Sequence, residues 1–219
     1  MRFNIDINFK VSKLIRRFII ADTLLFGGWG FVDPVFSVFI LQEIAGASLV
    51  TVGITVSIYW ILKSLIQVPV ALFLDRTDGE RDDFYTLITS FGIIGICAFL
   101  TTLAAHVWQL YLLQVLKAIG FGMYIASWPA LFSRHLDKGH YSLDWSLDST
   151  SIGFAIGITG FLSGIIVTWW GYDTLFIFAG IASFISAGVM LTVPHLVLPD
   201  VVHPGKPVLR DHAPVNINR

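Results

Sequence analysis

The sequence predicts an all-α membrane protein, a bundle of six transmembrane helices with both termini on the cytoplasmic side. Hydrophobic residues make up 55% of the chain and charged residues 13%, and the mean hydropathy is +0.76. These values are far from those of an ordinary soluble domain. Six apolar runs also reach the roughly 20 residues that a spanning helix needs.

The six predicted spans leave little chain for a separate soluble domain. In order, they cover residues 18–41, 49–74, 84–103, 108–131, 149–170 and 174–195. We therefore expect a transmembrane domain at 18–195, preceded by a polar and basic cytoplasmic segment at 1–17. The remaining residues, 196–219, form a proline-containing cytoplasmic tail.

The orientation follows from the distribution of Lys and Arg, which mark the cytoplasmic side of a membrane protein. Basic residues flank the spans on one side, at 1–17, 75–83, 132–148 and 196–219, whereas the loops at 42–48, 104–107 and 171–173 contain neither Lys nor Arg. We expect a multi-pass protein of the cell membrane whose main partner is the lipid bilayer. Because the basic clustering reflects topology, we expect no binding to nucleic acid.

Three charged residues lie near the middle of predicted spans. They are Asp33 in the first span, Lys63 in the second and Lys117 in the fourth. A charge at the bilayer centre costs about 2.5–3.5 kcal/mol on insertion scales, so such residues are normally paired or face water. At about 1.5 Å per residue, Asp33 and Lys117 lie at matching height above the cytoplasmic ends of their helices.

Two readings of this arrangement remain open from the sequence. The charges either line a polar cavity or form a buried Asp33–Lys117 ion pair that only sets the register of the helices. Two lysines and one aspartate favour an anionic or carboxylate-bearing small-molecule solute. Helical spacing adds aromatic and polar neighbours to the same faces, so the predicted substrate path comprises Asp33, Lys63, Lys117, Tyr124, Trp128, Trp29 and Gln114.

Glycine and proline recur at corresponding places in the first and fourth spans. A Gly-x-Gly at 28–30 precedes Pro34, and another at 120–122 precedes Pro129. Interrupted helices in two related halves mark substrate sites in transporters, although glycine and proline also serve as ordinary packing and kink residues. The pattern indicates a three-plus-three internal repeat.

The fifth span carries a stripe of glycines on one helical face, where a neighbouring backbone can approach closely. No Cys or patterned carboxylate accompanies the loop residues His135 and His140, and no spacing marks a nucleophile. We therefore expect no metal, no cofactor and no enzymatic activity. The predicted helix-packing residues are Gly153, Gly157, Gly160 and Gly164.

The segment ALFLDRTDGER at 71–81 resembles the loop between the second and third helices of the major facilitator superfamily. The family pattern is Gly, three residues, Asp, a basic residue, one residue and Gly, followed by basic residues. Here Ala71 replaces the first Gly of the pattern, and one additional residue precedes the second Gly, which is Gly79. The resemblance implies a loop that helps gate the cytoplasmic side, formed by Ala71, Asp75, Arg76, Gly79 and Arg81.

A basic residue before Gly-x-Gly, at Lys117, Gly120 and Gly122, resembles the fourth-helix motif of the same family. Family members normally have twelve helices in two six-helix halves, so the chain resembles an N-terminal half. The resemblance implies solute transport by alternating access, with a homodimer or a separate second half completing the transporter. The alternative is a non-transporting membrane assembly protein, or a truncated transporter remnant, whose charges only fix helix register.

Overall fold

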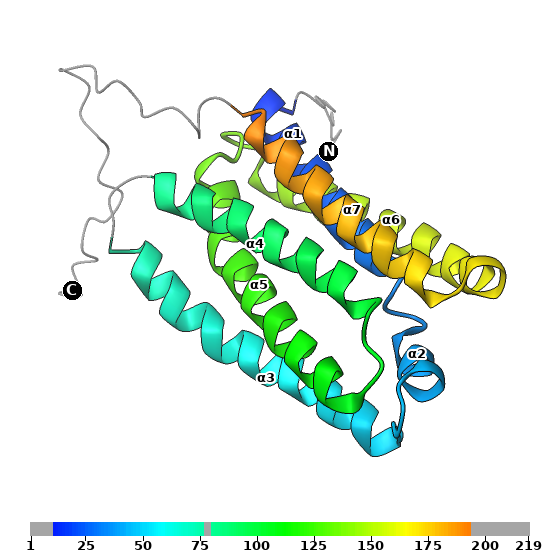
Figure 1. The fold of residues 1–219 in the computed structure, drawn as a ribbon. Coiled ribbons are helices and arrows are strands. Elements are labelled where there is room, and N and C mark those ends of the chain that lie inside the picture. The colour runs from blue at the N-terminus through cyan, green and yellow to red at the C-terminus, as the bar shows by residue number, and fades with distance from the viewer. Residues whose placement is uncertain (1–10, 77–79, 194–219) are drawn as a thin grey trace, which may run out of the picture.

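The computed structural model describes residues 11–76 and 80–193 and folds them into a helical bundle (Figure 1). Five helices, α3 to α7, are long and apolar enough to cross a membrane. The chain is a multi-pass integral membrane protein. The helices in order are α1 (Lys13–Gly30), α2 (Phe36–Glu43), α3 (Leu49–Leu74), α4 (Arg81–Thr101), α5 (Val107–Arg134), α6 (Tyr141–Trp170) and α7 (Tyr172–Leu191).

The first predicted span, residues 18–41, is wrong as a single helix. The hydroxyl of Ser12 caps α1 by accepting a hydrogen bond from the N–H of Ile15, and the helix ends at Gly30. Because Pro34 has no N–H, it cannot donate to the carbonyl of Gly30, and the regular ladder stops there. The helix resumes at Phe36 as α2, so the break falls at the predicted charged position, Asp33.

The second predicted interruption is absent from the described chain. Helix α5 runs without a break through Pro129. Trp128, Leu131 and Phe132 around this proline are all buried, and their packing holds the helix together despite one missing backbone hydrogen bond. The end of the sixth predicted span at 194–195, the tail at 196–219 and most of the segment at 1–17 lie outside the described residues.

The helices form two layers. One layer is a row in the order α3, α5, α1 and α6, in which α3 packs on α5 and α1 packs on α6. The pairs are joined in the middle by contacts of α1 with α5, such as the edge-to-face packing of Trp29 on Phe121 at 5.7 Å between ring centroids. Helices α4 and α7 lie side by side against one face of the row (Figure 1). As a consequence, α3 and α6 occupy the two edges of the row.

The start of α1 and the end of α7 lie at the same end of the bundle (Figure 1). The guanidinium of Arg17 donates a hydrogen bond of 2.7 Å to the hydroxyl of Thr192. At the opposite end, the hydroxyl of Tyr172 donates to the side-chain carbonyl of Gln42 at 2.7 Å. The start of α1 and the end of α7 therefore lie together at one end of the described bundle.

Glycines allow α1 to approach its neighbours closely. A Cβ placed on Gly28 would lie 2.5 Å from the Cβ of Ala182 on α7, and one on Gly30 would lie 2.4 Å from the hydroxyl oxygen of Thr159 on α6. Both distances are too short for real atoms. Close approach of backbones is the usual way in which transmembrane helices gain packing contacts.

We expect Gly28→Val to destabilise the bundle by about 1–3 kcal/mol, because overpacking forces α1 and α7 apart. Gly188→Val is the matched control, since a Cβ at Gly188 on α7 meets nothing within 4 Å. The midpoints of thermal unfolding in detergent test this difference. Equal losses for the two variants would show that helix propensity, and not packing, governs the effect.

Candidate solute-binding site

A pocket of about 390 Å³ opens on the α3–α5–α1–α6 row, between α1, α2, α3 and α5. Its walls combine ionisable side chains with aromatic rings and one amide. This mixture of a largely apolar lining with a few polar groups is typical of sites for small molecules. The residues that carry the polar and aromatic character are Trp29, Asp33, Phe36, Tyr59, Trp60, Lys63, Gln114, Lys117 and Phe121.

Lys117 is the most buried of the three charged residues that line the pocket, with only 8% of its surface exposed. Its ammonium nitrogen lies 3.8 Å from the ring centroid of Trp29 on α1 and 5.0 Å from that of Tyr59 on α3. Both distances are within the range of cation–π attraction. Aromatic faces from two other helices therefore help to hold this cation inside the bundle.

Asp33 lies in the turn between α1 and α2 and is exposed on the open side of the pocket. It interacts electrostatically with Lys117. Within the described part of the chain, however, Asp33 and Lys117 do not form an ion pair closer than 4 Å. The carboxylate and the ammonium thus share a pocket with space between them.

Lys63 is half-buried on α3. Its ammonium nitrogen lies 3.6 Å from the ring centroid of Trp60 on the same helix. Lys63 also interacts electrostatically with Lys117, so two cations and one carboxylate act on the same space. The pocket carries an excess of one positive charge from these three groups.

The structure brings five of the seven predicted path residues into this pocket and places the other two elsewhere. Trp29, Asp33, Lys63, Gln114 and Lys117 line it. Tyr124 and Trp128 do not belong to its lining and are buried further along α5. The indole of Trp128 stacks on Phe132 with 4.6 Å between ring centroids, which makes it part of the core.

Tyr124 takes part in an interaction that the sequence reasoning did not find. Its hydroxyl donates a hydrogen bond to the carboxylate of Asp22, and both side chains are buried. Asp148 on α6 is also buried and interacts electrostatically with Asp22. Asp22 lies on α1, and nothing in the sequence spacing indicates its partner on α5.

The predicted gating residues lie at the end of the bundle where α1 begins. Asp75 is the C-cap of α3, and both Arg76 and Arg81 are exposed. Gly79 lies outside the described residues. The structure adds an ion pair between Asp83 and Arg134, which links the start of α4 to the end of α5. No motif marked this pair, because its members are 51 residues apart.

Three of the four glycines in the predicted stripe of α6 face away from the rest of the described chain. A Cβ added at Gly153, Gly157 or Gly164 meets nothing within 4 Å, whereas one at Gly160 lies 3.4 Å from Pro34. A hollow of about 380 Å³ lies over the first two glycines. A larger hollow of about 570 Å³ on α3 has an apolar lining without ionisable groups, so it is a weaker candidate for a solute site.

Comparison with known proteins gives two positive findings. The family model "Major Facilitator Superfamily" matches residues 18–214. The crystal structure of the POT family transporter PepTSo is similar to this chain with a TM-score of 0.71 and 14% sequence identity, over 83% of this chain and 37% of that chain. The chain therefore spans well under half the length of that transporter. A search of curated protein sequences finds no match.

We expect Tyr124→Phe to lower stability by about 1–3 kcal/mol, because it leaves the buried carboxylate of Asp22 without its hydrogen-bond donor. Tyr85→Phe is the control, since Tyr85 is exposed on α4. Thermal unfolding in detergent measures both variants. A Tyr124→Phe protein as stable as the control would mean that the hydrogen bond contributes no net stability.

Proposed function

Since the chain belongs to the Major Facilitator Superfamily, we propose that it moves a small solute across the cell membrane by alternating access. The family match and the similarity to a POT family transporter support membrane transport in general. The proposal is that this chain acts as a half-size transporter, not as an enzyme, and needs a second six-helix half.

The observation that carries this proposal is the pocket around Lys117. It lies within the row of helices and combines two lysines, one aspartate and an amide with several aromatic rings. Ionisable groups at membrane depth mark substrate or ion pathways because they are costly to keep in hydrocarbon. The pocket also opens on the face of the row that α4 and α7 do not cover.

The charges favour a solute that carries a carboxylate or another anionic group. Lys117 and Lys63 offer ammonium donors, and charge-assisted hydrogen bonds to ionised groups are stronger than neutral ones. Asp33, on the exposed rim, would accept a hydrogen bond from a donor elsewhere on the same solute. The rings of Trp29 and Tyr59 would cover its apolar part.

Asp75, Arg76 and Arg81 are proposed to take part in gating at the end where α1 begins. The Asp83–Arg134 ion pair lies in the same region and holds α4 to α5. In alternating access, largely rigid bundles rock about a central site. A link within one bundle, such as this pair, would help the half move as one body.

We expect Asp33→Asn and Lys117→Met each to lower solute flux roughly tenfold or more, since losing one charge-assisted hydrogen bond costs about 1.5–3 kcal/mol. A thermal-shift screen of the purified protein with small carboxylates, amines and neutral analogues first identifies a solute. Flux is then measured in proteoliposomes. Asp173→Asn and Lys138→Met are the matched controls, because both side chains are exposed outside the pocket.

Unchanged flux in both pocket variants would refute the assignment of the site. A charge-swapped Asp33→Lys, Lys117→Asp protein that folds and behaves like the parent would instead favour the alternative, in which the charges only fix helix register.

A further inference from the structure

We propose that Gln114 determines the specificity of the pocket, and that the solute is an aromatic carboxylate with a hydroxyl group on its ring. Lys117 binds the carboxylate, and the amide of Gln114 binds the hydroxyl. The inference rests on the proposed function, because it names the solute of the same site. It is measured as binding, without transport, so either proposal can fail alone.

Gln114 is a buried polar side chain without a protein partner. It lies on α5, and only 4% of its surface is exposed. Within the described residues, its amide neither donates nor accepts a hydrogen bond. Buried polar groups normally have a partner, because an unsatisfied one destabilises the folded state. An amide kept in this state therefore has a role other than packing.

The amide of Gln114 is open to the pocket and not sealed in the core. Gln114 is part of the pocket lining. Among the described residues, several unpartnered side-chain atoms are fully enclosed, such as the indole nitrogens of Trp29 and Trp128, but the amide atoms of Gln114 do not belong to this group. The small exposed area of Gln114 therefore includes its amide, where a solute in the pocket can reach it.

Gln114 and Lys117 form a pair on the face of α5 that lines the pocket. They are three residues apart, so their Cβ atoms lie about 5–6 Å from each other. Lys117 is also buried, and within the described residues its ammonium contacts aromatic rings but makes no hydrogen bond. A cation and a neutral amide of one helix are thus both free to bind the same small molecule.

The two side chains bind different chemical groups. An ammonium donates charge-assisted hydrogen bonds to a carboxylate, which are stronger than neutral ones. The amide of Gln114 carries no charge and can both donate and accept, as can a hydroxyl group. The pair therefore matches a solute with one carboxylate and one neutral hydrogen-bonding group.

The other walls of the pocket are largely aromatic. Aromatic rings attract one another in offset-stacked or edge-to-face arrangements, in addition to the area that they bury. A solute with a flat ring therefore gains more from these walls than an aliphatic solute of the same size. The volume of about 390 Å³ is at the small end for ligand sites and suits one or two rings. The aromatic lining consists of Phe26, Trp29, Phe36, Tyr59, Trp60 and Phe121.

Asp33 is the competing acceptor for the hydroxyl group. It is exposed on the rim of the pocket, where water can satisfy its carboxylate. Gln114 is shielded from bulk water by its burial. A site discriminates most strongly when the wrong solute leaves a buried polar group unpaired. We therefore assign the hydroxyl to Gln114.

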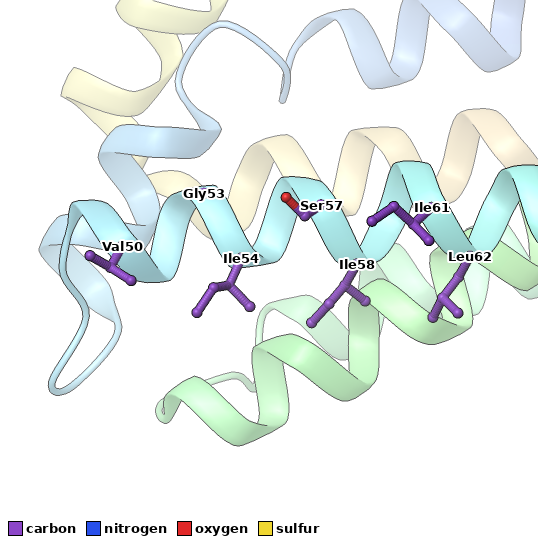
Figure 2. A pocket seen from close by; sticks show the side chains of 7 residues that line it. All are labelled: Val50, Gly53, Ile54, Ser57, Ile58, Ile61 and Leu62. Carbon is purple, nitrogen blue, oxygen red and sulfur yellow. The ribbon is translucent and has the colours of Figure 1, made fainter.

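The larger hollow on α3 lacks such groups. Figure 2 shows the side chains that line it, among which Ile54, Ile58 and Leu62 project from the helix. Ser57 has the only polar side chain in this lining. A carboxylate would find no cationic partner there, so the pocket around Lys117 is the site that fits this solute.

The first test needs no solute. Gln114→Leu replaces an unpartnered amide by an apolar side chain of similar size, so we expect the purified variant to unfold at the parent's temperature or above it. Gln67→Leu, on α3 and outside the pocket lining, is the matched control. A Gln114→Leu protein that unfolds at a markedly lower temperature than the control would show a structural role for the amide and overturn the proposal.

Isothermal titration calorimetry of the purified chain in detergent tests the solute class. The probes are benzoate, 3-hydroxybenzoate, 4-hydroxybenzoate and cyclohexanecarboxylate. We expect at least one hydroxybenzoate to bind the parent about tenfold more tightly than benzoate, because it adds one hydrogen bond at a buried group. Benzoate should in turn bind more tightly than cyclohexanecarboxylate, because only benzoate has an aromatic ring.

The same probes test the role of Gln114. Gln114→Leu should lower the affinity for the preferred hydroxybenzoate about tenfold and change that for benzoate less than about twofold. Gln67→Leu should bind every probe as the parent does. Lys117→Met should weaken the binding of benzoate and the hydroxybenzoates alike, because all of them carry the carboxylate. A residue that only shapes the pocket would not separate the two kinds of probe in this way.

Three binding results would overturn the proposal. Failure of the parent to bind any of the benzoates would exclude an aromatic carboxylate. Equal affinities of the parent for benzoate and both hydroxybenzoates would exclude recognition of the hydroxyl. A preference for the hydroxyl that persists in Gln114→Leu would assign it to another residue, such as Asp33. A chain that shows the expected binding but moves no solute in proteoliposomes would instead refute the proposed function and leave the specificity of the site in place.

Discussion

The position of Lys117 is the constraint on which the rest of the structure depends. An ammonium group buried in a membrane bundle must be compensated locally, and within the described residues no carboxylate lies within 4 Å of it. The faces of Trp29 and Tyr59 take that role. Because these rings come from α1 and α3, three helices must meet at one level around a single charge.

The break between α1 and α2 follows from the same region and determines the character of the pocket. A continuous helix would keep every backbone group of residues 31–35 bonded within itself. Pro34 prevents that, and the turn places Asp33 on the rim opposite Lys117. Phe36, the first residue of α2, then lies with its ring centroid 5.6 Å from the same ammonium nitrogen. The pocket is thus built around an interrupted helix, the arrangement associated with substrate sites in transporters.

The edge helices of the row are packed differently from its middle helices. The middle helices α1 and α5 are held by aromatic packing and by the Tyr124–Asp22 hydrogen bond, whereas α3 and α6 expose most of their surface. The polar opening between them is unsuited to lipid on that side.

Much of this protein was readable from the sequence by itself. Hydropathy determined the class of protein and the approximate locations of the second to sixth predicted helices, because the cost of exposing polar backbone to hydrocarbon leaves few alternatives. The cost of a buried charge likewise singled out Asp33, Lys63 and Lys117.

Only the tertiary structure decided which side chains meet. Whether Pro34 and Pro129 interrupt their helices depended on the packing around each, so the same residue type had opposite effects. Tyr124 and Trp128 share a helical stripe with Lys117, yet both are buried against α1. There Tyr124 donates a hydrogen bond to Asp22, and Trp128 packs edge-to-face on Phe18. Helical spacing defines a face within one helix, but the relative rotation and height of separate helices arise from contacts between residues far apart in the chain.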